Sequence, residues 1–144
     1  MREIRTSIEI AAPAERVWRI LSDQDAYGAW NPFIRSISGD LRPGGHLNVQ
    51  IAPPGRGATR FQPIVLRVEP NRELRWRGSF GMRGLFDGEH AFLLDPIDAG
   101  HTRFRQEERF SGLFVPLIVR GDLLESTRRG FIAMNEALKA RAEA

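Results

Sequence analysis

Apolar and polar residues alternate at the start of the chain. Between Arg2 and Ile10, the apolar residues Ile4 and Ile8 fall on one side of the alternation and Arg5 falls on the other. A period of two residues places successive side chains on opposite faces of a β-strand. The pattern therefore predicts a strand at residues 2–10 with one buried face.

Two short helical segments are expected next. Pro13 suits the first position of a helix, because its missing N–H would be unpaired there anyway. The apolar face of that helix comes from Val17, Trp18, Ile20 and Leu21. A second helical turn is expected from Asp25 to Trp30. It should stop at Asn31, because the residue before a proline avoids the α region.

Strands are expected along most of the remaining chain. Turn clusters rich in glycine, proline and asparagine separate them, and they are predicted at residues 33–41, 46–52, 60–69, 73–80, 89–95 and 102–110. In the strand at 60–69, we expect Ile64, Leu66 and Val68 to share one face. Strands joined by short turns pair in antiparallel fashion, so the pattern predicts an antiparallel sheet.

The period changes to that of a helix after Gly112. Apolar or inward-facing positions recur at helical spacing at Leu117, Leu124, Phe131, Asn135 and Leu138. We expect one continuous helix over residues 115–142, with Pro116 in its first turn, where proline is tolerated. At 1.5 Å per residue such a helix is about 40 Å long, enough to cover the apolar face of the sheet.

These elements predict an α+β fold. A curved antiparallel sheet of about six to seven strands would wrap one long C-terminal helix, with two short helices after the first strand. The pattern shows no repeat or linker, so we expect one domain over residues 1–144. That length buries about 70% of the surface of the unfolded chain, enough for a core without disulfides.

Composition narrows the classes of function. The chain has 42% hydrophobic and 27% charged residues and no cysteine, which is typical of a soluble globular protein and excludes disulfides and thiolate chemistry. No apolar run reaches the about 18–20 residues that span a bilayer, and residues 1–13 lack the apolar segment of a secretory signal. We expect a cytoplasmic protein.

The basic residues are almost all arginine and give a net charge of +3. They are spread along the chain and interleaved with acids, whereas nucleic-acid binding concentrates Lys and Arg on one face. This distribution favours a solvated, arginine-rich surface and no nucleic-acid partner. Binding to RNA or to an acidic membrane is the alternative.

Several segments resemble one protein superfamily. They are APAERVW (12–18), WNPF (30–33), LRWRG (74–78), GEHAF (88–92), TRF (102–104) and EERFSG (107–112). Together with the order of elements, they resemble the START-like, birch-pollen-allergen-like superfamily and, within it, the polyketide cyclase/dehydrase-like branch of the SRPBCC group. The resemblance covers essentially the whole chain. It implies the helix-grip fold and a pocket for lipids, sterols, polyketides or hormones, with cyclase or hydrolase activity in some members.

The last hairpin carries the best candidates for chemistry. On the strand at 102–110, one set of alternate positions holds only charged residues and must face water. Gln106 and Glu108 belong to the other set, so they must face the apolar side. The same argument turns His90 and Phe92 inward on the preceding strand. If Leu94 pairs with Phe104, then Phe92 meets Gln106 and His90 meets Glu108, with Cβ atoms about 5 Å apart.

A buried carboxylate needs a partner, and His90 would supply one for Glu108. The pair has two interpretations. It is either an acid–base pair in a pocket, suited to proton abstraction beside a carbonyl or to ring closure, or a polar clasp that closes the cavity wall.

Other residues are candidates for a ligand pocket. Trp30 and Trp76 belong either to the pocket wall or to the core. Asn31 either lines the pocket mouth or caps a turn. Arg128 either reaches the pocket, where it would pair with Glu108 or with an anionic ligand group, or extends to the surface. The loop at 81–86 is either a lid or an ordinary hairpin loop. The full set of candidate ligand-binding residues is Trp30, Asn31, Leu66, Trp76, Phe80, Phe86, Phe92, Phe104, Gln106, Phe110, Leu124, Arg128 and Phe131.

No pattern in the sequence indicates a cofactor or a metal. His46 and His101 have no partner at ligand spacing, and no glycine-rich phosphate loop joins a strand to a helix. An exposed edge strand makes a homodimer as reasonable as a monomer.

Three functions fit these features. The favoured one is a binding module for a small hydrophobic or aromatic molecule. The second is a cyclase, dehydratase or hydrolase with His90 and Glu108 as acid–base groups. The third is a protein-interaction domain with a collapsed interior.

Overall fold

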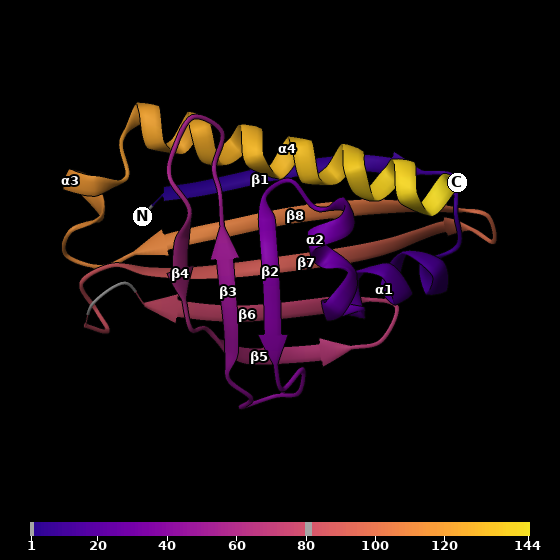
Figure 1. Ribbon diagram of the computed structural model, residues 1–144, viewed down its shortest axis with the longest axis horizontal. Helices are drawn as coiled ribbons and strands as arrows, with labels where there is room; N and C mark the ends of the chain where they lie inside the picture. The colour runs from indigo at the N-terminus through magenta and orange to yellow at the C-terminus, as the bar shows by residue number, and fades with distance from the viewer. Residues whose placement is uncertain (1, 80–81) are drawn as a thin grey trace.

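The computed structural model describes residues 2–79 and 82–144 and has the α+β helix-grip arrangement, with curved antiparallel sheets against a long C-terminal helix (Figure 1). The helices are α1 (Ala14–Ser22), a 3-10 turn η1 (Gln24–Ala26), α2 (Tyr27–Trp30), α3 (Val115–Ile118) and α4 (Gly121–Glu143). The strands are β1 (Arg2–Ile10), β2 (Ile34–Gly39), β3 (Leu47–Ile51), β4 (Thr59–Phe61), β5 (Ile64–Glu69), β6 (Glu73–Ser79), β7 (Asp87–Asp98) and β8 (His101–Ser111).

The strands form two sheets where the sequence predicted one. The larger sheet has the order β1-β8-β7-β6-β5 and the smaller has the order β2-β3-β4. In Figure 1 the smaller sheet crosses in front of the larger one, and α4 runs along the β1 and β8 side. The sheets meet where His46 bridges Ile64. The space between them, closed by α4, holds the core and the cavity described below.

The expected strand at 60–69 is in fact two strands, because the chain changes sheets at Pro63. Proline has no N–H to donate to a ladder, so pairing stops there, and Pro63 only accepts a hydrogen bond from the amide of Leu47 at 3.0 Å. A register shift follows between Val65 and Arg67. Ile64 and Leu66 are 41% and 37% exposed, whereas Val68, beyond the shift, packs against the core, so the prediction that Ile64, Leu66 and Val68 share one face is wrong.

The expected continuous helix is also interrupted. The helical backbone ends at Ile118, Arg120 is extended with φ −110° and ψ 178°, and α4 starts at Gly121. Glycine is a poor helix former, so Gly121 does not favour continuation of the helix across the break. Leu117, expected to face inward, lies on α3 before the break and is 63% exposed.

The buried face of α4 is rotated slightly from the expected stripe. Its buried residues are Ser126, Thr127, Gly130, Phe131, Met134, Asn135, Leu138 and Ala142. Thr127 therefore faces inward and Arg128, one position further on, is exposed. Gly130 allows close packing, because a Cβ at this position would overlap the ring of Phe33.

The register predicted for the last hairpin is confirmed. Strands β7 and β8 pair Leu94 with Phe104, Phe92 with Gln106 and His90 with Glu108. The inward residues Phe92, Leu94 and Phe104 are fully buried. The even period of the strands, together with the charged outer face of β8, determined this register.

Candidate functional site

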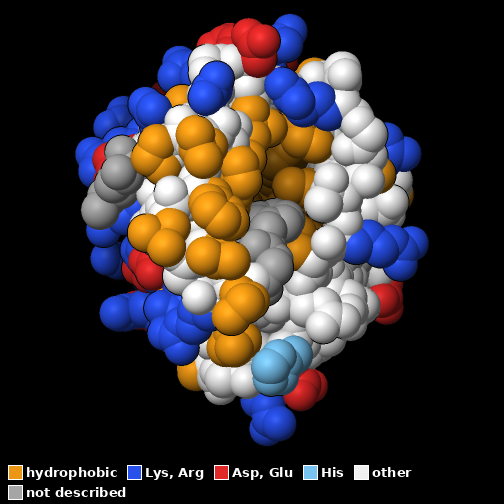
Figure 2. Space-filling view, turned by 90° about the vertical axis from the view of Figure 1, so that its left-hand side faces the viewer, with side chains coloured by type: hydrophobic (Ala, Val, Ile, Leu, Met, Phe, Trp, Pro, Cys, Tyr) orange, Lys and Arg blue, Asp and Glu red, His pale blue; other side chains and the backbone are white. Residues whose placement is uncertain are grey.

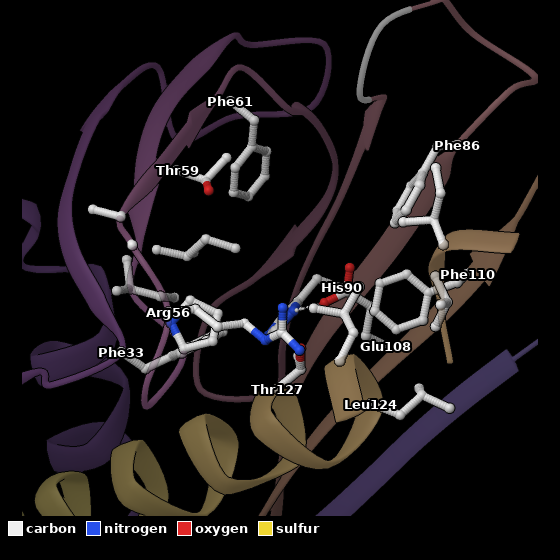
Figure 3. A pocket seen from close by; sticks show the side chains of 18 of the residues that line it. Phe33, Arg56, Thr59, Phe61, Phe86, His90, Glu108, Phe110, Leu124 and Thr127 are labelled. Atoms are coloured by element: carbon white, nitrogen blue, oxygen red, sulfur yellow. Dashed lines mark hydrogen bonds and ion pairs between the residues drawn. The ribbon is translucent and has the colours of Figure 1, made fainter. Parts of the chain in front are cut away.

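A cavity of about 570 Å³ opens between the two sheets and the start of α4 (Figure 3). Its lining is mostly apolar and comes from both sheets, the turn at 53–58, and the helices α3 and α4. The lining residues are Phe33, Ile34, Ile51, Pro53, Arg56, Gly57, Ala58, Thr59, Phe61, Trp76, Phe86, His90, Glu108, Phe110, Ile118, Val119, Leu123, Leu124 and Thr127.

Three neighbouring strands place a row of inward side chains on the cavity wall. Trp76 of β6 pairs with His90 of β7, which pairs with Glu108 of β8. The ring of Trp76 stacks on the imidazole of His90, with centroids 5.3 Å apart and planes 22° apart. The antiparallel ladder thus sets an aromatic surface, an imidazole and a carboxylate side by side.

The imidazole of His90 is held on both sides. Its Nδ1 lies 2.9 Å from Oε1 of Glu108 and its Nε2 lies 3.0 Å from Oε1 of Gln106. Rings of Phe92 and Phe131 pack against it with centroids 4.6 and 5.0 Å away. With only 4% of its side chain exposed, the ring cannot turn without breaking these contacts.

A chain of hydrogen bonds behind His90 determines which of its ring nitrogens donates to Gln106. The hydroxyl of Thr6 donates to the backbone carbonyl of Gln106 and accepts from the side-chain amide of Asn135. The carbonyl of Asn135 is therefore free to accept from Nε2 of Gln106, at 2.9 Å. This leaves Oε1 of Gln106 as an acceptor, so Nε2 of His90 must be the donor.

The exchangeable proton of the pair therefore lies between Nδ1 of His90 and Glu108. Either Nδ1 donates to an ionised carboxylate, or a protonated Glu108 donates to Nδ1. Glu108 also borders the cavity and keeps 16% of its side chain exposed. Gly88 leaves the space for this carboxylate, because a Cβ there would overlap Oε2 of Glu108.

Arg56 brings a positive charge to the opposite side of the cavity. Its side chain extends from the turn at 53–57 toward Thr127 and the His90–Glu108 pair (Figure 3). The turn is tied to α4, since the hydroxyl of Ser126 donates to the carbonyl of Pro54 at 2.6 Å. Within residues 2–79 and 82–144, no ion pair engages Arg56, so its guanidinium is available to an anionic group.

The sequence matches a family model described as "Polyketide cyclase / dehydrase and lipid transport" over residues 1–143. The chain belongs to this family. A search of curated proteins finds no significant match.

Solved structures of the same fold accompany this family match. A START superfamily protein from Mycobacterium smegmatis is 23% identical, with a TM-score of 0.76 over 98% of this chain and 97% of that one. The Zhui aromatase/cyclase from a Streptomyces species is 17% identical, with a TM-score of 0.75 over 99% and 93%. A norcoclaurine synthase point mutant from Thalictrum flavum, in complex with a transition-state analogue, is 13% identical, with a TM-score of 0.70 over 98% and 93%. At these identities the likeness shows the fold alone.

The cavity of this family member contains part of the expected site. Trp76, Phe86, His90, Glu108, Phe110 and Leu124 line it. Four further candidates lie behind the wall in the core, fully buried, and support it from there: Phe92, Phe104, Gln106 and Phe131.

Leu66, Arg128, Trp30 and Asn31 lie away from the cavity, and one expected residue lies outside the described residues. Leu66 faces outward after the shift in β5, and Arg128 is exposed on α4. Trp30 borders a separate, smaller hollow beside α1. Phe80 falls outside the residues that the structure describes.

Asn31 caps a turn, one of its two expected roles. Its Oδ1 accepts from the amides of Phe33 and Ile34 at 2.9 and 2.8 Å. Asn31 therefore positions Phe33 in the cavity wall without lining it.

Nearby, the hydroxyl of Tyr27 donates to the carbonyl of Leu21, and burial raises the pKa of this tyrosine above its usual range.

Sequence reasoning missed the residues contributed by the smaller sheet and by the inner face of α4. Arg56 stands in a turn cluster, which carries no signal for a pocket. Thr59 and Phe61 alternate with Arg60, which could have indicated a common face. Thr127 lies three residues after Leu124 and four before Phe131, a spacing that places it on the buried stripe.

The loop at 82–86 is joined to the segment before α3. Amides of Leu113 and Phe114 donate to the carbonyls of Gly84 and Leu85 at 3.1 and 2.9 Å. Gly112 makes this approach possible, with φ +122° and no Cβ to meet the carbonyl of Leu85. The loop borders the cavity through Phe86, and its expected action as a lid stays a prediction.

Two features are absent from the described part of the chain. No helix there is long and apolar enough to cross a bilayer. No group of three or more His, Cys, Asp or Glu side chains there is placed to hold a metal ion.

Proposed function

We propose that the protein binds a small, mostly apolar molecule that carries one polar or anionic group. The cavity is the observation that supports this proposal. Its volume of about 570 Å³ falls in the range of about 300–1,000 Å³ typical of sites for small molecules. Its many apolar atoms and few converging polar groups are the usual composition of such sites.

The lining suggests how such a ligand would lie. Phe33, Phe61 and Phe110 offer apolar and aromatic surface on different walls. Arg56 and Thr127 would donate hydrogen bonds to an oxygen of the ligand, and Arg56 would also supply charge. A flat or elongated carbon skeleton with a carbonyl, carboxylate or phenolate group would satisfy all of these contacts.

An enzyme acting on such a molecule is the second candidate, and the His90–Glu108 pair favours it. In the ionised pair, the carboxylate of Glu108 would take a proton from a carbon beside a ligand carbonyl. The electrons of the C–H bond would then form an enolate, whose oxygen Arg56 would stabilise. His90, which carries a proton on each ring nitrogen in the ionised pair, would orient the carboxylate through the hydrogen bond from Nδ1, and the abstracted proton would stay on Glu108.

The protein-interaction alternative required a collapsed interior. The volume of the cavity argues against it, because a packed core leaves few voids larger than a water molecule.

Filling the cavity tests the binding proposal. Leu124→Trp would place an indole in the cavity from α4, whereas Leu66→Trp adds the same group on the exposed face of β5 and serves as the matched control. We expect the unmodified protein and the control to take up anilinonaphthalene sulfonate, and Leu124→Trp to bind it at least about tenfold more weakly. Equal uptake by both variants would contradict the proposal.

Native mass spectrometry of gently purified protein would identify a bound metabolite. With that molecule in hand, Glu108→Gln separates the two candidates. Loss of turnover with retained binding would establish the enzyme. If His90→Ala and Glu108→Gln leave both affinity and turnover unchanged, neither function of the pair holds.

A further inference from the structure

An exposed apolar surface lies beside the cavity opening. Most of the large hydrophobic side chains that are exposed in the described residues come from the loop at 82–86 and the segment 112–118. We define them as the mouth patch: Met82 (72% exposed), Leu113 (76%), Phe114 (44%), Leu117 (63%) and Ile118 (45%). Figure 2 shows hydrophobic side chains gathered beside a hollow on this face.

The mouth patch is continuous with the cavity. Ile118 belongs to both, since it lines the cavity and is also exposed. The two segments of the patch are held together by the backbone hydrogen bonds from Leu113 and Phe114 to the loop. Val115 at the start of α3 and Val119 directly after it are buried in the core, so Leu117 and Ile118 between them are held facing outward.

The mouth patch has cations within both of its segments. Residues 82–86 and 112–121 contain Arg83 and Arg120, and the next acids along the chain are Asp87 and Asp122. Both arginines are exposed, and neither forms an ion pair with any residue that the structure describes. The acid that follows the loop, Asp87, accepts hydrogen bonds from Ser79 and Gly84.

We propose that the mouth patch docks on the surface of an anionic lipid bilayer. Apolar side chains that project singly, flanked by arginines, can enter the boundary between headgroups and acyl chains while the cations contact lipid phosphates.

Docking would bring the cavity opening to the bilayer surface, and the following consequence for ligand transfer rests on the proposed function. If the cavity holds an apolar molecule, that molecule can pass between the bilayer and the cavity along Ile118 without crossing water. Docking itself does not depend on a ligand, so the two proposals are tested separately.

Flotation of the full chain with lipid vesicles tests docking. The probes are vesicles of phosphatidylcholine alone and of phosphatidylcholine mixed with phosphatidylserine. We expect binding to the mixed vesicles, little binding to phosphatidylcholine, and weaker binding as salt is added. Absence of binding to the mixed vesicles overturns the proposal.

Matched variants locate the contact. The double variant Leu113→Ser/Leu117→Ser should lose at least about tenfold in vesicle binding. Arg83→Gln and Arg120→Gln should each lose about fivefold. The controls are Ile97→Ser and Arg103→Gln, exposed residues around the β7–β8 turn at the other end of the sheet, and they should bind as the unmodified protein does.

Two further measurements keep the test decisive. Leu117→Trp adds an indole whose fluorescence should shift to the blue on mixed vesicles, and an unshifted spectrum overturns the proposal. A dimer that Leu113→Ser/Leu117→Ser dissociates, with no vesicle binding by the unmodified protein, would make the patch a protein interface instead. Leu124→Trp should lose the ligand and keep vesicle binding, which separates failure of docking from failure of the proposed function.

Discussion

Nδ1 of His90 lies 2.9 Å from Oε1 of Glu108, directly across the β7–β8 ladder. The pair is buried on the side of His90 and opens to the cavity on the side of Glu108. A carboxylate in this setting depends on its partner, because an unpaired buried charge is strongly unfavourable. The relationship therefore has consequences for stability as well as for chemistry.

Glu108→Gln should lower the free energy of unfolding by about 1–3 kcal/mol, since a charge-assisted hydrogen bond in a partly buried site is lost. Glu107→Gln is the matched control. It changes the neighbouring residue on the outer face, which pairs with Arg105, and should cost under about 1 kcal/mol. Urea denaturation measures the free energy of unfolding of both variants. Equal losses would show that the His90–Glu108 pair stabilises the protein no more than the outer Glu107–Arg105 pair does.

Nε2 of His90 should be the ring nitrogen that donates to Gln106, because Oε1 of Gln106 offers it an acceptor. Nitrogen-15 NMR of the imidazole distinguishes the two ring nitrogens. Gln106→Met should remove this preference and destabilise the fold by about 1–3 kcal/mol through unpaired buried groups. A neutral ring with its proton on Nδ1 in the unmodified protein would contradict the hydrogen-bond direction derived above.

Arg56→Gln should weaken binding of anilinonaphthalene sulfonate about tenfold, since a charge-assisted hydrogen bond contributes about 1.5–3 kcal/mol, and should leave binding of an uncharged apolar dye unchanged. Fluorescence titration compares the two dyes. Arg60→Gln, an exposed neighbour on β4 outside the cavity lining, is the control. A parallel loss for both dyes would assign Arg56 to the cavity shape and not to charge recognition.

Gly130→Ala should destabilise the protein by about 1–3 kcal/mol, because its Cβ would overlap the Phe33 ring in a packed core. Gly121→Ala places the same methyl group where no atom lies within 4 Å. It should leave stability unchanged or raise it by up to about 1 kcal/mol. Thermal unfolding of the two variants gives the comparison, and a stable Gly130→Ala would contradict the close packing of α4 on Phe33.

The β7–β8 turn should contribute a pH-dependent increment of stability. Hydrogen bonding to Asp98 raises the pKa of His101, and His101 in turn lowers the pKa of Asp98. The contribution of His101 to stability is fully present below about pH 6.5, the pKa of an unperturbed histidine, and is lost as the pH rises through the raised pKa of the folded protein. The contribution of Asp98 is fully present above about pH 4 and is lost as the pH falls through the lowered pKa of Asp98 in the folded protein. The two residues therefore contribute their full stabilisation between about pH 4 and pH 6.5.

NMR titration of His101 checks this linkage. Asp98→Asn should move its midpoint to lower pH. Asp40→Asn, which removes the carboxylate paired with Arg42, is the control and should leave the midpoint in place. An unshifted midpoint in Asp98→Asn would contradict the ion pair.

The sequence by itself determined the class of fold and the centre of the candidate site. Alternation on β7 and β8 placed His90, Gln106 and Glu108 inward, and their register followed because a strand that slips by one residue exposes its whole buried face. These are local rules that act between neighbouring residues, so they can be applied without coordinates.

Only the tertiary structure decided the shape of the cavity around that centre. Pro63 and Gly121 interrupt regular structure locally, but the sheet that each strand joins on either side of Pro63, and with it the exposure of Leu66, depends on distant strands. Arg56 and Thr127 reach the site because a turn and a helix far apart in the chain meet through Ser126 and Pro54. Helical spacing could have placed Thr127 on the buried stripe, but the rotation of α4 that leaves Arg128 exposed is set by contact with Phe33 and the sheet.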